Sequence, residues 1–372
     1  MKKIAIVSTH PIQYNAPWMQ LLHGRGRVQV KVFYTWAQPK EGLNYDQGFG
    51  RLIKWDIPLL DGYEHLFTQT VHGIEVKKLV EDWHPDAILV IGWRYKGHFA
   101  CMRYFKGKIP VLFRGDSTLT DEKINIKTVF RRIFLSFIYR YIDVALYVGT
   151  NNKNYFLAHG LTERQLYPAF HAVDNDRFSQ NHIVKNDAQE LRQNLGISPN
   201  DFVVLFAGKL EKKKNPLVIL ELAKLIKDKE IVFLVTGNGK LEREFKNRAV
   251  QDPRIKFLDF QNQSKMPAVY AAADLLLLPS TGPGETWGLV ANEAMACALP
   301  IIISSKAGGA IDLVNENGII VDPEDVGRMS KFIEEVKNDK KRHEKLKMNS
   351  LQHIQNFNFT QIVEGIERAC GL

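Results

Sequence analysis

Two separate series of short β-branched runs constrain the fold of this chain more than any other feature. Turn residues bound each run, and longer stretches with helical periodicity separate the runs. The first series is KIAIVS (3–8), VQVKVFY (28–34), AILVI (87–91), PVLF (110–113) and DVALYV (143–148), and the second is FVVLFAG (202–208), EIVFLVTG (230–237), IKFLDF (255–260), DLLLLPS (274–280), LPIIIS (299–304) and GIIV (318–321). Alternating strands and helices predict parallel sheets covered on both faces, and hence two doubly wound α/β domains.

The length agrees with two domains, because the 372 residues exceed the roughly 250–300 at which a single core stops growing. We expect an N-terminal domain over residues 1–180, a second domain over 181–350 after a polar linker near 179–200, and a C-terminal helix over 351–372. In such sheets ligands bind beyond the carboxyl ends of the strands, so two facing domains would enclose a cleft there.

Composition predicts a soluble globular protein of a reducing compartment. Hydrophobic residues make up 45% and charged residues 24%, unlike a disordered or fibrous chain. Cys101, Cys297 and Cys370 lie far apart without CxxC spacing, so neither a disulfide framework nor a zinc site is indicated. The first apolar run is too short for a signal peptide, and no window approaches the roughly 20 apolar residues of a membrane span. A cytoplasmic location is expected.

The net charge of +9 is concentrated in the first half of the chain. Residues 1–180 carry 24 Lys and Arg against 16 Asp and Glu, whereas residues 181–372 carry 26 against 25. Such asymmetry favours an anionic partner for the first domain, such as a membrane surface, a polyanion or a phosphorylated acceptor.

Two stretches that follow strands of the second series could meet phosphate. The run 202–207 is followed by Gly208, Lys209 and the basic run 212–214, where cations could neutralise phosphate oxygens; a solvated basic turn is the alternative. The stretch FLVTGNGKLERE places Gly237 and Gly239 at the end of the next strand, where a nucleotide could approach the backbone. That stretch matches neither the Walker pattern nor the dinucleotide fingerprint.

The stretch GETWGLVANEAMACALPIIIS (284–304) brackets seven uncharged residues with Glu285 and Glu293. If a helix begins near Thr286, its N-terminal amides form an anion site suited to a diphosphate. Glu293 would lie roughly 12 Å of axial rise from Glu285, so each carboxylate could accept from one hydroxyl-rich end of a nucleotide sugar. Alternatively, Glu285 is a residue favoured at a helix start and Glu293 a partly buried, paired acid.

The order and spacing of these motifs, with YAAADLLLLPS, GLVANEAMACALPIIISSKAGGAIDLV and ENGIIVDPED, resemble the family-4 retaining glycosyltransferases. The resemblance covers essentially the whole chain and is most specific between Val203 and Asp325. It implies the GT-B architecture: two Rossmann-like domains, a donor nucleotide sugar held mainly by the second, and a C-terminal helix crossing back to the first. It also implies independence of metal ions and other cofactors, and it favours UDP over GDP as the donor nucleotide.

The resemblance assigns roles to particular residues of the second domain. Glu285 matches the acid that contacts the hydroxyls of the donor sugar, and Glu293 matches the acid that binds the ribose. Lys209 and Lys214 match the two basic positions that clamp the diphosphate. Arg is commoner at the first position, and Lys209 would make that contact as a point charge.

Three further positions are carried over from the family. Gly288 and Leu289 match residues whose amides approach the phosphates. The segment around Gln263 to Lys265 resembles the loop beside the base. With Gly208, Gly237, Gly239 and Thr286, these residues complete the expected donor site.

In the first domain, the opening STHPIQYNAP resembles a subgroup in which this loop lies beside donor and acceptor. His10 could hydrogen-bond a sugar hydroxyl or phosphate, or cap local backbone. In PVLFRGDS, Arg114 and Asp116 stand where several relatives have a His after the corresponding strand, so the role of that His cannot be transferred. Either residue could face the acceptor or the transferring sugar, or the two could form a structural salt bridge.

The segment FHAVDNDRF (170–178) contains an Asp-x-Asp, the metal-binding pattern of a different glycosyltransferase fold. We interpret it as a turn with Asx hydrogen bonding, because no strand context for a metal accompanies it. Asp174 remains a candidate on the acceptor or donor side, near the junction of the domains.

The stretch KTVFRRIFLSFIYRYI (127–142) places apolar residues at helical spacing with Lys and Arg elsewhere on the helix. These apolar residues are Phe130, Ile133, Phe134, Phe137, Ile138 and Tyr141. Such a helix could lie in a membrane interface, but packing on the first sheet is the preferred interpretation.

These observations predict a retaining transferase that moves a hexose from a nucleoside diphosphate sugar to a glycan or lipid-linked glycan, in cell-surface polysaccharide or lipopolysaccharide assembly. The enzyme would be cytoplasmic, and its basic first domain allows peripheral contact with the inner face of the membrane. A sugar-nucleotide epimerase or a phosphorylase could use a related fold. A non-catalytic basic protein that binds membrane is the third alternative, and it leaves the Glu pair unexplained.

Overall fold

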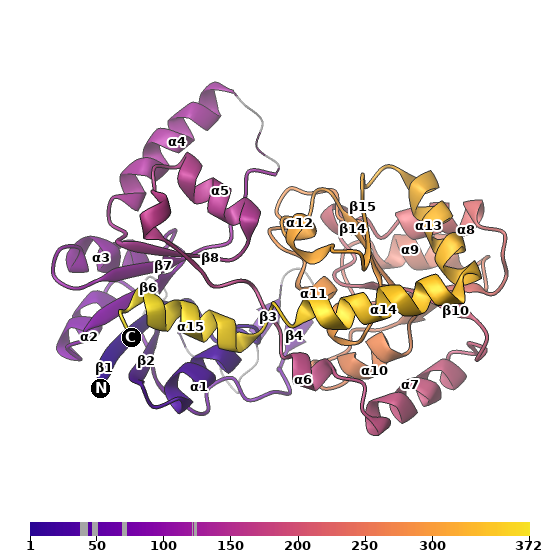
Figure 1. The fold of residues 1–372 in the computed structure, drawn as a ribbon, viewed down its shortest axis with the longest axis horizontal. Helices are drawn as coiled ribbons and strands as arrows, with labels where there is room; N and C mark the ends of the chain where they lie inside the picture. Colours follow the sequence, from indigo (N-terminus) through magenta and orange to yellow (C-terminus); the bar gives the residue numbers. More distant parts are fainter. Residues whose placement is uncertain (38–43, 47–50, 69–72, 121, 123–124) are drawn as a thin grey trace. The chain divides into compact units, whose positions relative to one another are not determined.

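The structure is a computed structural model that describes residues 1–37, 44–46, 51–68, 73–120, 122 and 125–372. The chain divides into two compact units, coloured along the sequence in Figure 1. Unit 1 comprises Met1–Leu43, Ile57–Ala172 and Asn358–Leu372, and unit 2 comprises Asn44–Asp56 and Val173–Phe357. Each unit is built on one parallel sheet with helices on both faces, so the predicted pair of Rossmann-like α/β folds is confirmed.

Unit 1 contains a seven-stranded sheet in the order β5-β2-β1-β6-β7-β8-β9, with every pair of neighbours parallel. Its strands are β1 (Lys2–Ser8), β2 (Val28–Tyr34), β5 (Glu64–Phe67), β6 (Ala87–Ile91), β7 (Val111–Arg114), β8 (Val144–Tyr147) and β9 (Leu166–Pro168). The central strands are apolar on both faces because helices cover both, which explains their continuous β-branched runs. The short edge strands β5 and β9 carry no such run and were not predicted.

Two layers of helices cover this sheet. One face packs against α2 (Val76–Asp82), α3 (Lys96–Phe105), α4 (Ile126–Tyr139) and α5 (Thr150–Ala158). The other packs against α1 (Ala16–Gly24) and the C-terminal helix α15 (Phe359–Ala369).

Helix α15 is anchored in unit 1 by packing and by charge. Ile362, Val363 and Ile366 are buried with α1. The buried Glu367 forms ion pairs with Arg25 at 3.2 Å and Arg27 at 3.3 Å. The end of the chain therefore belongs to the first unit, as part of its core.

Unit 2 contains a six-stranded parallel sheet in the order β12-β11-β10-β13-β14-β15. Its strands are β10 (Phe202–Ala207), β11 (Ile231–Thr236), β12 (Ile255–Leu258), β13 (Leu275–Leu278), β14 (Ile301–Ser304) and β15 (Gly318–Val321). Its helices are α6 (Asn175–Phe178), α7 (His182–Asn194), α8 (Val218–Leu225), α9 (Glu242–Ala249), α10 (Met266–Ala271), α11 (Leu289–Ala296), α12 (Ala310–Leu313), α13 (Val326–Asn338) and α14 (Lys340–Ile354).

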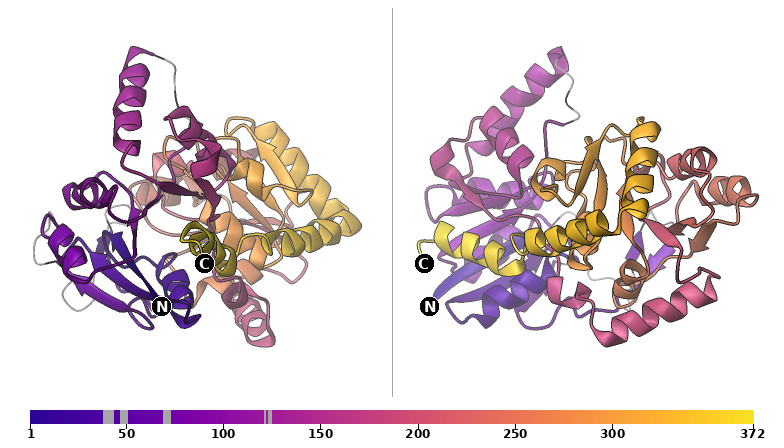
Figure 2. Two further views of the ribbon diagram at one scale, coloured as in Figure 1. Left: turned by 60° about the vertical axis from the view of Figure 1, so that its left-hand side comes forward. Right: turned by 45° about the vertical axis from the view of Figure 1, so that its right-hand side comes forward.

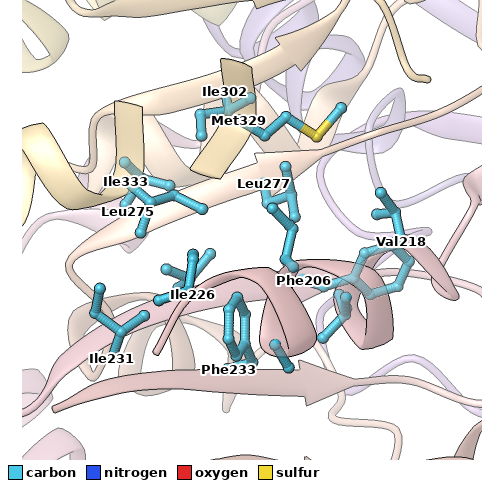
Figure 3. Packing of buried hydrophobic residues seen from close by; sticks show 14 of the residues in the cluster. Phe206, Val218, Ile226, Ile231, Phe233, Leu275, Leu277, Ile302, Met329 and Ile333 are labelled. Carbon is cyan, nitrogen blue, oxygen red and sulfur yellow. The ribbon is translucent and has the colours of Figure 1, made fainter. Parts of the chain in front are cut away.

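The core of unit 2 forms where α8 and α13 cover the sheet. Figure 3 shows Phe206, Phe233 and Leu277 from neighbouring strands packed against Ile226 and Met329. This layer holds β10 and β13 side by side, with Val204 opposite Leu275. The loops that follow these two strands therefore begin next to each other.

The stretch 179–200 was predicted to be a linker, and the structure contradicts this. It contains α7, which packs on α10 within unit 2. Asn181 caps α7 by accepting from the amide of Val184 at 3.0 Å, and Arg192 donates to the carbonyl of Ala272 at 3.2 Å. Its polar composition reflects an exposed helix surface, with Ala188 buried beneath it.

Residues 44–56 were predicted to belong to the first domain but lie in unit 2. They include the antiparallel pair β3 (Asn44–Asp46) and β4 (Arg51–Ile53). Asn262 donates to the carbonyl of Lys54 at 2.7 Å, and the hydroxyl of Ser264 donates to the carboxylate of Asp56. These long-range bonds, which local sequence does not encode, attach the segment to the loop before α10.

Helix α4 packs on the first sheet through one side only. Leu135, Ile138 and Tyr139 are buried in the core. Phe130 and Phe137, which were predicted to face the sheet, are 67% and 46% exposed. Apolar residues occupy both sides of this helix, so its periodicity alone could not select the buried side. No helix in the described part of the chain is long and apolar enough to cross a membrane.

Candidate functional site

The loops after β10 and β13 bring Lys214 and Glu285 together. The short helical turn η3 (Lys212–Lys214) follows β10, and its Lys213 carbonyl accepts from the amide of Thr281 at 2.8 Å. This bond joins the two loops at the carboxyl edge of the sheet. There the ammonium group of Lys214 donates to Glu285 Oε2, and Ser280 Oγ donates to the same oxygen at 2.8 Å.

The surroundings hold the Glu285 carboxylate in place. The side chain of Glu285 is 9% exposed and that of Lys214 is 18% exposed. The carbonyl of Glu285 also accepts from the amide of Gly308 at 2.8 Å, which fixes its backbone to the turn after β14. Because both side chains are largely buried, water screens their charges weakly and they attract each other strongly. The ion pair therefore holds the two charges in fixed positions at the carboxyl edge of the sheet.

Helix α11 begins at Leu289, and the prediction that it begins near Thr286 is wrong. Gly288 is the N-cap with φ +106°, and a Cβ there would lie 2.7 Å from Leu278 Cδ2. The left-handed conformation turns the chain into the helix three residues later than expected. Thr286 is half-buried in the loop, so the axial rise expected between Glu285 and Glu293 does not apply. The first-turn amides are those of Leu289 and its neighbours.

Glu293 is buried inside unit 2. It is 2% exposed, and its Oε2 accepts from the hydroxyl of Tyr270 on α10 at 2.6 Å. Burial raises the pKa of the Cys297 thiol well above its ordinary value, and the charge of Glu293 adds to this effect. Glu293 is thus an oriented carboxylate in an apolar helix interface.

The glycines after β10 and β11 differ in what surrounds them. A Cβ on Gly237 would lie 2.0 Å from the carbonyl oxygen of Gly208, and one on Gly239 would lie 2.6 Å from that of Leu210. A Cβ on Gly208 would meet no atom within 4 Å. Gly237 and Gly239 are therefore required for packing of adjacent loops, whereas Gly208 borders open space.

Two other predicted donor residues, Lys209 and Gln263, also lie in unit 2. Lys209 is half-buried and directly follows Gly208. Gln263 is 5% exposed, and its Oε1 accepts from Arg177 at 2.9 Å. Gln263 is therefore held by a neighbouring guanidinium.

In unit 1, His10 follows β1 and joins an aromatic group. Its Nδ1 is 2.9 Å from Thr9 Oγ1, and its ring stacks on Trp36 with centroids 4.5 Å apart. The ring of Tyr95 contacts the ring of Trp36 edge-on, with centroids 6.0 Å apart. Trp36 and Tyr95 are 36% and 39% exposed, so the group offers aromatic surface beyond the carboxyl ends of β1, β2 and β6.

Arg114 ends β7 and Asp116 follows it, near His171, which sequence reasoning did not select. Arg114 is buried and donates to the carbonyl of Ala169. Burial lowers the pKa of its guanidinium to about 10, and Asp116 opposes this effect. Burial, with help from Arg114, lowers the pKa of His171 to about 3. His171 is therefore neutral near pH 7.

Asp174 is the N-cap of α6 and accepts from the amide of Arg177 at 3.1 Å. The following Asn175 donates to the carbonyls of Ile354 and Phe357, both at 3.2 Å. The Asp-x-Asp segment thus caps α6 and ties the start of that helix to the end of α14. In the described residues no three His, Cys, Asp or Glu side chains gather as a metal site.

Sequence reasoning missed Ser280 and Tyr270, which fix the two glutamates. Ser280 lies two residues after the end of β13, so its place after a strand was an available signal. Tyr270 lies on α10, and nothing in the local sequence links it to Glu293, which is 23 positions away.

Part of unit 2 is similar to a known protein family. Residues 187–353 match the family model described as glycosyl transferases group 1. The chain therefore contains a glycosyl transferases group 1 domain. That domain includes β10 to β15 and every predicted donor residue.

Proteins similar to this part of the chain are named glycosyltransferases. A protein named D-inositol 3-phosphate glycosyltransferase from Salinispora arenicola is 28% identical over 216 residues, which cover 54% of this chain and 48% of that protein. The chain thus spans about half the length of the curated relatives it matches.

Solved structures extend the likeness to nearly the whole chain. The structure of Anabaena Alr3699/HepE in complex with UDP has a TM-score of 0.74 at 21% identity and covers 99% of both chains. WaaG, described as a glycosyltransferase involved in lipopolysaccharide biosynthesis, has a TM-score of 0.67 at 15% identity, covering 99% of this chain and 98% of that one. This likeness shows the GT-B fold.

Proposed function

We propose that this protein is a retaining glycosyltransferase that moves a hexose from a nucleoside diphosphate sugar, first of all a UDP-sugar, to a glycan or lipid-linked glycan. The observation that carries the proposal is the Lys214–Glu285 pair at the carboxyl edge of the group 1 domain. The UDP found with Anabaena HepE, a protein of the same fold, favours a uridine donor. A setting in cell-surface polysaccharide or lipopolysaccharide assembly, in the cytoplasm, is part of the proposal.

The donor would bind along the loops after β10, β11 and β13. Lys209 and Lys214 would neutralise the diphosphate oxygens, and the first-turn amides of α11 would donate to them. Gly208 borders open space, which leaves room for a phosphate against its backbone. Glu293 would accept from the ribose hydroxyls and Glu285 from those of the hexose.

In the transfer itself, the bond between C1 of the hexose and the diphosphate oxygen breaks, and its electron pair stays on the diphosphate. The acceptor hydroxyl oxygen then bonds C1 from the same face, and its proton passes to the leaving diphosphate. Lys209 and Lys214 would stabilise the charge that develops on the diphosphate. Preorganised charges of this kind commonly supply the largest share of enzymatic rate enhancement.

Residues of unit 1 would supply the acceptor side. His10 with its aromatic neighbours, and Arg114 with Asp116, lie at the carboxyl ends of the strands of that unit's sheet. We propose them as contacts for the acceptor or the transferring sugar. Independence of metal ions remains a prediction of the family resemblance.

A melting-temperature panel with UDP, GDP, ADP and their sugar conjugates tests donor binding. A ligand that binds only the folded state stabilises it, by about 2.7 kcal/mol at a hundredfold excess over its dissociation constant. A selective rise with a uridine ligand, reduced in Glu293→Ala, is expected. Mass spectrometry of lipid-linked acceptors incubated with the selected sugar nucleotide would then detect the transferred hexose. If no nucleotide shifts the melting temperature, the proposal fails.

A further inference from the structure

Helix α4 carries a continuous apolar strip on the side that faces away from the core. The α4 strip consists of six large side chains that are between 46% and 72% exposed: Ile126, Val129, Phe130, Ile133, Phe134 and Phe137. At 3.6 residues per turn they share an arc of about 140°, opposite the buried Leu135 and Tyr139. Contiguous apolar surface of this kind marks an interaction site.

The arrangement of unit 1 keeps the α4 strip accessible within that unit. In Figures 1 and 2 the N-terminal part of α4 extends away from the sheet and the neighbouring helix α5. Asn125 caps this end by accepting from the amide of Thr128 at 3.1 Å, so the projecting turn is a formed helix. The strip is therefore presented on an ordered element.

The loop after β6 extends the surface with interfacial residue types. The ring of Trp93 meets Phe134 edge-on with centroids 5.7 Å apart. The next three residues, Arg94, Tyr95 and Lys96, are exposed. Trp and Tyr with flanking Arg and Lys are the residues enriched where proteins meet lipid headgroups.

The charged residues of helix α4 itself are all positive. Residues 125–142 contain four Lys and Arg and neither Asp nor Glu. Arg132 forms an ion pair with Glu122 at 2.8 Å, and Arg131 donates to the hydroxyl of Tyr155 at 3.1 Å. Lys127 and Arg140 are exposed at the borders of the strip. The partner must therefore accept apolar side chains while presenting negative charge.

We propose that the α4 strip docks unit 1 on an anionic lipid bilayer. Its apolar side chains enter the headgroup region, and Lys127, Arg140, Arg94 and Lys96 contact lipid phosphates. A second copy of the chain fits less well, because a symmetric contact would bring the same cations face to face. This inference goes beyond the proposed transfer reaction and does not depend on it.

The test is cosedimentation of the full chain with vesicles, either phosphatidylcholine mixed with phosphatidylglycerol or phosphatidylcholine alone. Binding to the mixed vesicles that weakens in high salt is expected. Phe130→Asp should weaken it by about tenfold or more, because a large apolar side chain that would enter the bilayer is lost. Val250→Asp, which also replaces an exposed apolar residue by Asp but at a site in unit 2 that is 78% exposed, should bind as the parent does.

A second pair of variants isolates the charge. Lys127→Glu combined with Arg140→Glu should reduce binding to the mixed vesicles by about tenfold or more. Lys185→Glu, at an exposed position of α7, should not. Melting temperatures of all variants, with and without the donor nucleotide, check that the fold and the donor site are intact.

Three results would overturn the proposal. The first is equal binding to both kinds of vesicle, or no binding to either. The second is equal binding by Phe130→Asp and the parent. The third is a dimer in sedimentation velocity that Phe130→Asp abolishes, since this would assign the strip to a second copy. None of these results bears on nucleotide binding, so the failure of this inference is distinguishable from failure of the proposed function.

Discussion

Lys214 and Glu285, 71 positions apart in the sequence, form an ion pair that Ser280 completes from the end of β13. The pair joins the loops of two neighbouring strands and lies where the family resemblance expects the donor diphosphate and hexose. It therefore has two measurable consequences, one for stability and one for turnover.

Lys214→Met should lower the free energy of unfolding by about 1–3 kcal/mol, because Glu285 keeps its largely buried charge with Ser280 as a remaining donor. Denaturant unfolding measures the change. Lys212→Met, at an exposed position of the same turn, is the matched control and should be neutral within about 0.5 kcal/mol. Equal stability of the two variants would show that the pair contributes nothing.

Glu285→Gln should reduce turnover by about a hundredfold or more, because the side chain keeps its size but loses the charge that accepts from sugar hydroxyls. Steady-state transfer with the donor selected by melting temperature measures it. Glu244→Gln removes a carboxylate that pairs with Arg248 on the surface of α9 at 3.0 Å, and should leave turnover unchanged. Parent-like turnover in Glu285→Gln would remove Glu285 from the active site.

Glu293→Ala and Tyr270→Phe should separate binding from packing. The first removes the proposed ribose acceptor, whereas the second removes only the hydroxyl that donates to it at 2.6 Å. Uridine ligands should raise the melting temperature of Tyr270→Phe more than that of Glu293→Ala. If uridine ligands raise the melting temperatures of Glu293→Ala and the parent equally, Glu293 does not bind the ribose and has only a structural role.

Gly237→Ala should destabilise unit 2 by about 2–4 kcal/mol, because the new methyl group meets the Gly208 carbonyl oxygen and φ is +125°. Gly24→Ala, at the end of α1 with no atom within 4 Å of the new Cβ, should be neutral or stabilising. Thermal unfolding compares them. A stable Gly237→Ala would show that the loops after β10 and β11 can separate at little cost.

Acidification should destabilise unit 1 partly through His171, whose pKa is lowered from 6.5 to about 3 by burial and by Arg114. The unfolded chain protonates this ring below pH 6.5 and the folded chain does not. Its contribution is therefore complete above pH 6.5 and is lost as the pH falls toward 3. The melting temperature of His171→Asn should fall less than the parent's between about pH 7.5 and about pH 5. Parallel curves would mean that His171 titrates normally.

Local sequence was sufficient for most of the fold. The central strands were located because a strand buried on both faces must be apolar throughout, and the run AILVI at 87–91 has that property. The edge strands β5 and β9 were missed because they lack it. Residues 179–200 were assigned to a linker because an exposed helix and a loop share a polar composition.

The candidate site shows the same division. Motif order placed Lys214, Glu285 and Glu293 after strands or in a helix, and the structure brings the first two into contact. The start of α11 was misplaced because Gly288, a left-handed N-cap, sets it. The partners Ser280 and Tyr270 were missed because hydrogen bonds to distant carboxylates leave no mark on the local pattern.

The sequence by itself determined the alternation of strands and helices and the residue types at the strand ends, because these follow from periodicity and local chemistry. Only the tertiary structure decided which loops meet, which side of α4 is buried and where residues 44–56 belong. Those outcomes depend on packing between segments far apart in the chain. Lys214 and Glu285 became a pair only when the sheet set β10 beside β13.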